Sequence, residues 1–191
     1  MINTPTITTP TTPKLWDWAI AELQTELEAN ISWLTVAFGK ASRKVRSKDG
    51  RDIRYPAVFT SGGDYLSMFP DGHIGNYSWI DVRDYQEFTS EDRRQEQYLS
   101  SEIGLVFWLD LQSAYPADYT LRTIEHAKND VIVALQNIKL TRSVLSVDRV
   151  AEWAENIYRG YTYNEIESQF LMFPYTGFRF EGEMTMNPQC P

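Results

Sequence analysis

The residues best suited to metal chemistry are few and widely separated in this 191-residue sequence. Its histidines are His73 and His126, and its one cysteine is Cys190. Structural metal sites collect several His or Cys ligands at short spacings, such as two cysteines two residues apart. Neither histidine has a neighbour of this kind. We therefore predict no metal site, no cofactor and a surface position for both histidines.

Three acidic residues, Asp81, Asp84 and Glu87, follow one another closely in the middle of the chain. Glycosidases use two carboxyl groups across a cleft to protonate the leaving group and to activate or act as the nucleophile. A solvated strand end explains the same cluster in a chain with 26 acidic residues. A polar surface is the favoured interpretation, and a hydrolase using Asp81 or Asp84 is an alternative.

The segment Ser61-Gly62-Gly63 could belong to a catalytic serine turn or to a phosphate-binding loop. A serine nucleophile elbow stands between a strand and a helix, whereas a strand is expected after this segment. A phosphate-binding loop needs a helix N-terminus, and no Lys-Ser or Lys-Thr follows the glycines. A tight turn is enough to explain the glycine pair. We therefore expect no catalytic residue and predict that the protein is not an enzyme.

The strongest local signal is a basic segment, residues 40–54. It holds seven Lys or Arg residues and two Asp residues, a net charge of +5, which leaves −13 for the rest of a chain whose total is −8. Asp49-Gly50 predicts a two-residue hairpin turn. Like charges then stand opposite one another, so we expect the hairpin to project and to bind something anionic. The candidate binding residues are Lys44, Arg46, Lys48, Arg51 and Arg54.

The pairing predicted for this hairpin sets Lys48 opposite Arg51 and Arg46 opposite Ile53. The alternation of side chains along a strand then divides the segment between two faces. One face is predicted to carry Lys44, Arg46, Lys48, Arg51, Ile53 and Tyr55, and the other Val45, Ser47, Asp52 and Arg54. Neither face is apolar enough to cover a core.

Three partners for the basic segment can be weighed: solvent alone, nucleic acid, or a neighbouring copy of the chain. A sequence pI of about 4.8 opposes general nucleic-acid binding, which depends on neutralising phosphates. A neighbouring copy offers a complementary acidic surface, and head-to-tail contacts of this kind can close into rings. We therefore expect a homo-oligomer, with nucleic acid at most passing transiently through a ring.

The distribution of apolar residues predicts three regions and three helices. Thr- and Pro-rich residues 1–13 are expected to form a flexible arm, residues 14–187 a single α+β domain, and residues 188–191 a tail. Apolar residues at three- and four-residue steps predict the helices. They are expected at Pro13–Ala29, from Thr120 to Ile138, and from Ser146 to Gly160.

The strand signals complete the predicted fold. A nearly continuous apolar run, Glu102–Leu111, indicates a central strand, and alternation over Phe178–Met186 indicates a terminal strand with Gly182 as a gap. Shorter strands are expected at Arg54–Thr60, at Asp64–Phe69 and at Tyr77–Val82, and a loop or short helix at Thr89–Gln97. The expected class is α+β, a mixed, mainly antiparallel sheet packed by an N-terminal helix and two later helices, with a protruding β-hairpin.

Composition bears on location and partners. The N-terminal residues lack the basic and apolar regions of a signal peptide, and no apolar run is long enough to cross a membrane. One cysteine permits no internal disulfide, so a cytoplasmic protein is expected. Aromatic residues make up 14% of the chain, which suits an assembling surface, an aromatic core, or stacking on sugars.

The order of these elements resembles the tail-terminator (tail-completion) and neck proteins of tailed bacteriophages. The pieces that carry the resemblance are Leu15–Leu34, the arm around Asp49-Gly50, Glu102–Leu111, Thr120–Ile138 and Gly177–Met186. The resemblance implies a non-enzymatic virion protein that forms a ring and contacts other tail or neck proteins. It also implies residence in the host cytoplasm during assembly and in the virion afterwards. A carbohydrate- or protein-binding module is the first alternative.

Overall fold

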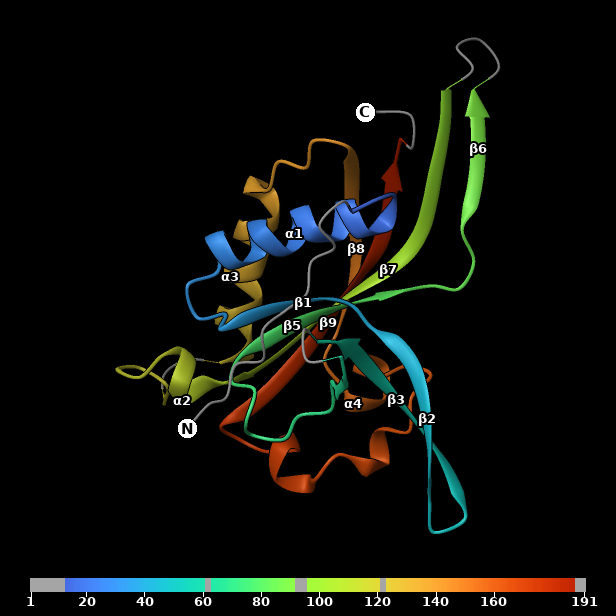
Figure 1. Cartoon of the computed structure of the whole chain (residues 1–191). Coiled ribbons are helices and arrows are strands. Elements are labelled where there is room, and N and C mark those ends of the chain that lie inside the picture. The colour runs from blue at the N-terminus through green and yellow to red at the C-terminus, as the bar shows by residue number, and fades with distance from the viewer. Residues whose placement is uncertain (1–12, 61–62, 92–95, 121–122, 188–191) are drawn as a thin grey trace.

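A mixed β-sheet forms the centre of the computed structural model, which describes residues 13–60, 63–91, 96–120 and 123–187 (Figure 1). The strand order is β1-β5-β7-β9-β8, and β6 pairs with part of β7. The β1–β5 pair is parallel and the other pairs are antiparallel, which confirms the predicted α+β class. The strands are β1 (Val36–Lys40), β5 (Tyr77–Val82), β6 (Glu87–Glu91), β7 (Glu96–Asp110), β8 (Ser143–Ala151) and β9 (Tyr175–Met186).

Two helices cover one face of this sheet, α1 (Trp16–Asn30) and α3 (Ile124–Asn137) (Figure 1). The apolar stripe that predicted the first helix points inward, so Ile20, Leu23 and Leu27 are buried. The second predicted helix is also present, but Thr123 rather than Thr120 is its N-cap. A short helix, α2 (Leu111–Ala114), directly follows β7.

A smaller, three-stranded sheet and several short helices cover the opposite face. The sheet order is β2-β3-β4. These elements are β2 (Ser42–Lys48), β3 (Arg51–Phe59), β4 (Tyr65–Ser67), α4 (Ala154–Ile157) and the 3-10 helices η1 (Tyr163–Glu165) and η2 (Ser168–Leu171). The central strand β7 therefore sends Leu105 and Phe107 into the core under α1 and α3, and Val106 and Trp108 into a second core on the other side. Burial on both faces explains the continuous apolar run in this strand.

The helix predicted from Ser146 to Gly160 is wrong for most of its length. Residues Ser143–Ala151 form β8, and only α4 remains helical within that range. A bulge interrupts the β8–β9 pairing between Val147 and Arg149. Because the bulge adds one residue, Val147 and Val150 lie on the same face although they are three positions apart. A spacing of three along a bulged strand thus imitated the spacing of a helix.

The segment Thr89–Gln97 is also not the predicted loop or helix. Within the described residues it contributes to the paired strands β6 and β7, with Thr89 opposite Tyr98 and Phe88 opposite Leu99. This hairpin extends beyond the helices at the end of the molecule opposite the β2–β3 hairpin (Figure 1). The described side chains of Phe88, Thr89 and Gln97 are all exposed, so this part shows no alternation of buried and exposed positions, and strand pairing keeps it extended.

Candidate interaction surface on the basic hairpin

The β2–β3 hairpin turns at Asp49 and Gly50, whose φ angles are 52° and 73°. Two successive residues with positive φ are typical of a type I′ turn, which matches the twist of the flanking strands. The register sets Lys48 opposite Arg51, Arg46 opposite Ile53 and Lys44 opposite Tyr55. The predicted turn and strand register are therefore confirmed.

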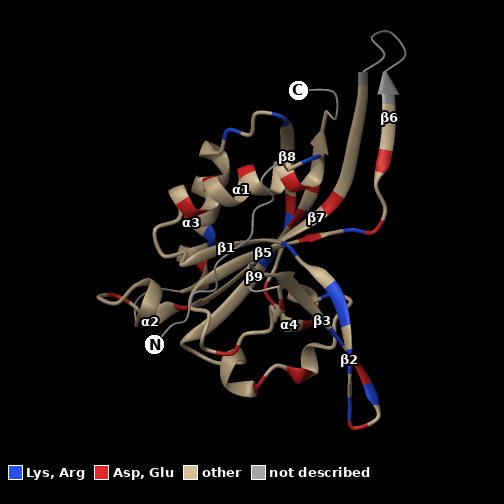
Figure 2. Cartoon of the chain, in the orientation of Figure 1, with Lys and Arg blue, Asp and Glu red and all other residues tan. Residues whose placement is uncertain are grey.

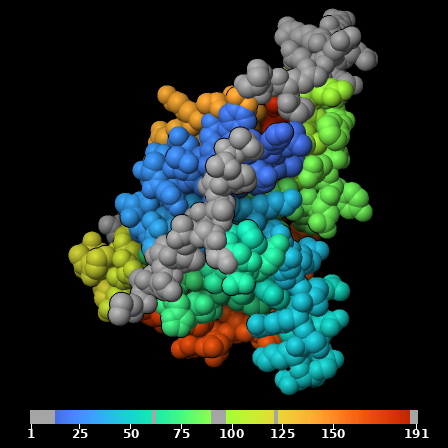
Figure 3. Space-filling model, in the orientation of Figure 1, coloured from blue at the N-terminus to red at the C-terminus, as the bar shows by residue number. Residues whose placement is uncertain are grey.

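Four of the five candidate residues lie on one face of the hairpin. Lys44, Arg46, Lys48 and Arg51 share that face, while Arg54 stands opposite Val45 on the other. Figure 2 shows Lys and Arg concentrated along this arm, and Figure 3 shows the arm projecting from the lower end of the molecule. The geometry brings the basic groups together; their role in binding remains a prediction.

Several of these cations are already engaged by side chains of the same molecule. Lys44 Nζ lies 3.7 Å from the ring centroid of Tyr65, and the Arg46 guanidinium lies 5.4 Å from that of Tyr55. Cations over aromatic faces gain electrostatic stabilisation and remain accessible on their outer side. Within the described part of the chain, the side chains of Arg51 and Arg54 are exposed and make no ion pair, although the charge of Arg51 acts on Glu165 at longer range.

The hairpin is tied to the body along one edge, a contact that alternation in the sequence does not reveal. The Thr162 amide donates to the carbonyl oxygen of Arg54 at 2.8 Å, and the Arg54 amide donates to Thr162 Oγ1 at 3.0 Å. Farther out, Lys48 Nζ donates to Glu165 Oε2 at 2.7 Å. The arm therefore has a fixed direction rather than swinging freely from its base.

The hydrogen bond from Lys48 lowers the pKa of Glu165, and the charges of Lys48, Arg46 and Arg51 lower it further. A carboxylate whose pKa is lower in the folded state stabilises that state above its unfolded-state pKa, and the contribution is lost as pH falls through the folded-state pKa. The tether is thus complete at neutral pH and released in acid.

Replacing Lys48 with Met is expected to raise the pKa of Glu165 toward its ordinary value, because the direct hydrogen bond is removed. Arg51→Met is the matched control, since Arg51 acts on Glu165 only through its charge and contributes less. A carboxyl-carbon NMR titration of Glu165 measures both shifts. Equal shifts in the two variants would contradict the tether.

A network of charged and aromatic side chains lies at the base of the arm, exposed at Arg43 and Asp84 and buried at Asp81 and Arg179. The Arg43 guanidinium lies 5.4 Å from the ring centroid of Tyr161 and 3.9 Å from Asp84. The Tyr161 hydroxyl donates to Asp81 Oδ1 at 3.1 Å, and Arg179 Nη1 donates to Asp81 Oδ2 at 2.8 Å. Burial, together with the Asp81 carboxylate, raises the pKa of Tyr161 and keeps its hydroxyl protonated.

This network shows what the predicted acidic cluster does. Asp81 is buried in β5 with a hydrogen-bond donor on each carboxylate oxygen, whereas Asp84 and Glu87 are exposed. Asp81 therefore joins β5 to Arg179 of β9 and to the segment before η1. The favoured interpretation, a solvated acidic surface, fits Asp84 and Glu87 but is wrong for Asp81. The charge of Arg179, which stabilises Asp81, comes from a strand 98 positions away in sequence.

The remaining candidate residues have local structural contacts or lie outside the described residues. The His73 amide donates to Asp71 Oδ1 at 2.9 Å in a turn, and the His126 ring contacts Thr123 at the start of α3. Ser61, Gly62 and Cys190 lie outside the described residues, as do residues 1–12 and 188–191 of the predicted arm and tail.

Within the described ranges, no group of three or more His, Cys, Asp or Glu residues is arranged to hold a metal ion. None of the helices in these ranges is long and apolar enough to span a membrane.

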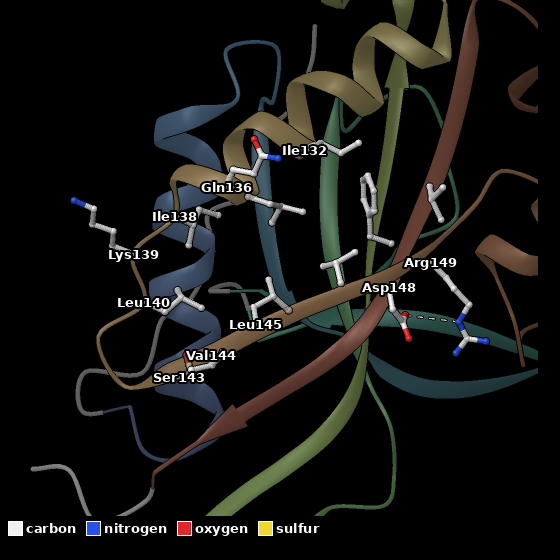
Figure 4. Close-up of a pocket in the computed structure, with 14 residues that line it drawn as sticks. Ile132, Gln136, Ile138, Lys139, Leu140, Ser143, Val144, Leu145, Asp148 and Arg149 are labelled. Carbon is white, nitrogen blue, oxygen red and sulfur yellow. Dashed lines mark ion pairs between the residues drawn. The ribbon is translucent and has the colours of Figure 1, made fainter.

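The structure has a second candidate interaction surface, which the sequence does not predict because most of β8 has the spacing of a helix. It is an apolar groove between α3 and β8, with a volume of about 710 Å³, which we call the α3–β8 groove (Figure 4). Its lining includes Ile132 and Leu135 of α3, Leu145 and Val147 of β8, and Phe180 of β9. The sequence signal that could have found its β8 wall is the pair Val147 and Val150, which the bulge sets on one face.

Comparison with known proteins identifies no family for this chain. No protein-family model matches the sequence, and no curated protein matches it. The function proposed for the chain therefore rests on its own charges, contacts and exposed surfaces.

Proposed function

We propose that this chain is a non-enzymatic structural protein of a tailed bacteriophage, a tail terminator or head–tail neck subunit. In this proposal it forms a ring that caps or joins the tail tube, first in the host cytoplasm and then in the virion. The observation that carries the proposal is the division of charge, +5 on the hairpin segment 40–54 and −13 on the rest of the chain. Such a molecule is complementary to a second copy of itself.

The arrangement of the charged elements supports a head-to-tail contact. Helix α1 contains Asp17, Glu22, Glu26 and Glu28 and no basic residue. It lies on the face of the central sheet opposite the β2–β3–β4 sheet (Figure 2). A contact between different surfaces on two copies leaves a free surface at each end, which is the condition for building a ring. We therefore place α1 of the next copy as the acceptor of the arm.

The double variant Arg51→Gln/Arg54→Gln tests the contact. Both side chains are exposed and make no ion pair within the described residues, so their loss should weaken association without unfolding the protein. We expect at least a tenfold rise in the apparent Kd of self-association, measured by light scattering after size-exclusion chromatography. Raising the salt concentration should weaken the wild-type oligomer in the same way.

Lys14→Glu is the matched control, because it lowers the net charge by the same two units at an exposed position outside the arm. It should leave the oligomer intact. An unchanged oligomer in the double variant, or an equal loss in the control, would contradict the proposed role of the arm. Neighbouring genes that encode tail or head proteins would support the phage assignment independently.

A further inference from the structure

The molecule exposes a short apolar segment between η2 and β9, which begins at the last residue of η2. Leu171, Met172 and Phe173 are consecutive and 44%, 63% and 64% exposed. The Phe173 ring stacks on that of Tyr119 with centroids 6.2 Å apart and planes 21° apart. The Leu111 amide also donates to the carbonyl oxygen of Pro174 at 2.9 Å. The loop, which we call the 171–173 loop, is therefore held in place with its apolar side chains in solvent.

The α3–β8 groove is the concave counterpart. In Figure 4 the labelled side chain of Ile132 points from α3 toward the cavity, Leu145 approaches from β8, and Lys139 points away at the rim. The groove lies between α3 and β8, the edge strand of the sheet. Contiguous exposed apolar surface of this kind marks interaction sites.

The 171–173 loop cannot fill the groove of its own molecule. It lies just before Tyr175, the first residue of β9, whereas β8 pairs with the later part of β9, from Arg179 to Met186. At about 3.4 Å per residue these positions lie about 14 to 37 Å beyond the start of β9. In Figure 1 the segment before β9 lies at the lower end of the molecule, and β8 begins at the upper end. The occupant must come from another molecule.

Charge favours the loop of a second copy as this occupant. Residues 161–178 include Glu165 and Glu167 and no Lys or Arg. Glu165 is already paired with Lys48 of its own molecule, so Glu167 is the acidic group that this segment offers to a partner. At the rim of the groove Arg149 is already engaged by Asp148 at 3.7 Å and by Glu181 at 3.8 Å, so Lys139 is the basic group that can meet Glu167 when the apolar side chains enter the groove.

The β8 bulge favours insertion of side chains over addition of a strand. It interrupts the regular edge of β8 between Val147 and Arg149, and an interrupted edge is a poor template for a further strand. The same bulge turns Val147 and Val150 toward the groove, which enlarges its apolar wall.

We propose that the α3–β8 groove binds the 171–173 loop of a second copy of this chain, in a head-to-tail contact. This inference rests on the proposed function for the ring. It adds an apolar contact between subunits to the charged contact made by the basic arm. The loop and the groove are distinct surfaces, so each copy keeps one of each available and the contact can repeat.

Substitutions to Asp at exposed positions test the groove and the 171–173 loop separately. Ile132→Asp alters the groove, and its control is Val133→Asp, the next residue of α3, which has similar exposure (47% against 42%) but does not line the groove. Met172→Asp alters the loop, with Tyr85→Asp as an exposed control elsewhere. Sedimentation velocity over a range of concentrations should show self-association of the wild-type chain. We expect Ile132→Asp and Met172→Asp each to weaken it at least tenfold.

Mixing the two variants gives the sharpest outcome. Ile132→Asp keeps its loop and Met172→Asp keeps its groove, so a mixture can form one intact contact and should give a 1:1 dimer that grows no further. A wild-type chain that stays monomeric, variants that assemble normally, or a mixture that forms no dimer would overturn the inference. If Arg51→Gln/Arg54→Gln assembles normally while these variants do not, the proposed role of the arm fails and the groove contact stands.

Discussion

Replacing Arg179 with Met is expected to destabilise the protein by about 3–5 kcal/mol, since it leaves the Asp81 carboxylate buried without its counter-ion. Arg179 is 2% exposed and also lies 3.3 Å from Glu181 through Nε. It occupies the space above Gly104, where an added Cβ would come within 2.4 Å of the guanidinium. Urea denaturation measures the loss.

The control for this prediction is Arg159→Met. Arg159 is an exposed residue whose guanidinium lies 3.8 Å from the same Glu181, and a surface pair of this kind contributes less than about 1 kcal/mol. Adding Asp81→Leu to Arg179→Met should recover part of the loss, because the unpaired charge disappears. Similar stabilities for Arg179→Met and Arg159→Met would show that the network does not hold β5 and β9 together.

Gly182→Ala is expected to cost about 3 kcal/mol and to loosen β8. A Cβ at this position would lie 1.9 Å from the carbonyl oxygen of Ser146 and 2.9 Å from Cα of Val147. Both are backbone atoms of the facing strand, so no side-chain rotation relieves the contact. Because β8 forms one wall of the α3–β8 groove, the variant should also lose self-association. Urea denaturation and amide hydrogen exchange in β8 measure the two effects.

Gly39→Ala is the comparison for this prediction. Its added Cβ would meet Gln24 Oε1 at 3.2 Å and Ile20 Cγ2 at 3.4 Å, which are side-chain atoms and lie farther away than the backbone atoms facing Gly182. A smaller loss is therefore expected there, with hydrogen exchange in β8 unchanged. If Gly182→Ala and Gly39→Ala behave alike, the close approach of β8 to β9 does not limit stability.

The elements predicted well from sequence are those whose local signals agree with their burial. The periodic apolar stripe of α1, the doubly buried run of β7 and the Asp49-Gly50 turn each carry their own signal. The failures occur where tertiary pairing decides the local structure. Residues Ser143–Ala151 have a helical spacing only because of the bulge, and Thr89–Gln97 is extended because it pairs across the β6–β7 hairpin.

The candidate site, too, can be predicted from the sequence only where local signals decide the structure. The positions of the basic side chains follow from a two-residue turn and the alternation of strands, so the sequence is sufficient for them. The tether from Lys48 to Glu165 and the ion pair between Asp81 and Arg179 join residues 117 and 98 positions apart. No local pattern encodes such distant pairs. The α3–β8 groove depends on knowing which strand lies at the edge of the sheet, and that is a property of topology.

The long pairing of β7 with β9 has a mechanical consequence. The two strands face each other over twelve residue pairs, from Leu99 opposite Met186 to Asp110 opposite Tyr175. Antiparallel hydrogen bonds run perpendicular to the strands, so a pull along β7 loads the whole ladder in shear at once. A pull that peels β8 sideways opens its pairs one after another. Tension applied along the β6–β7 hairpin is therefore carried through the centre of the molecule, and the weak direction lies across its β8 edge.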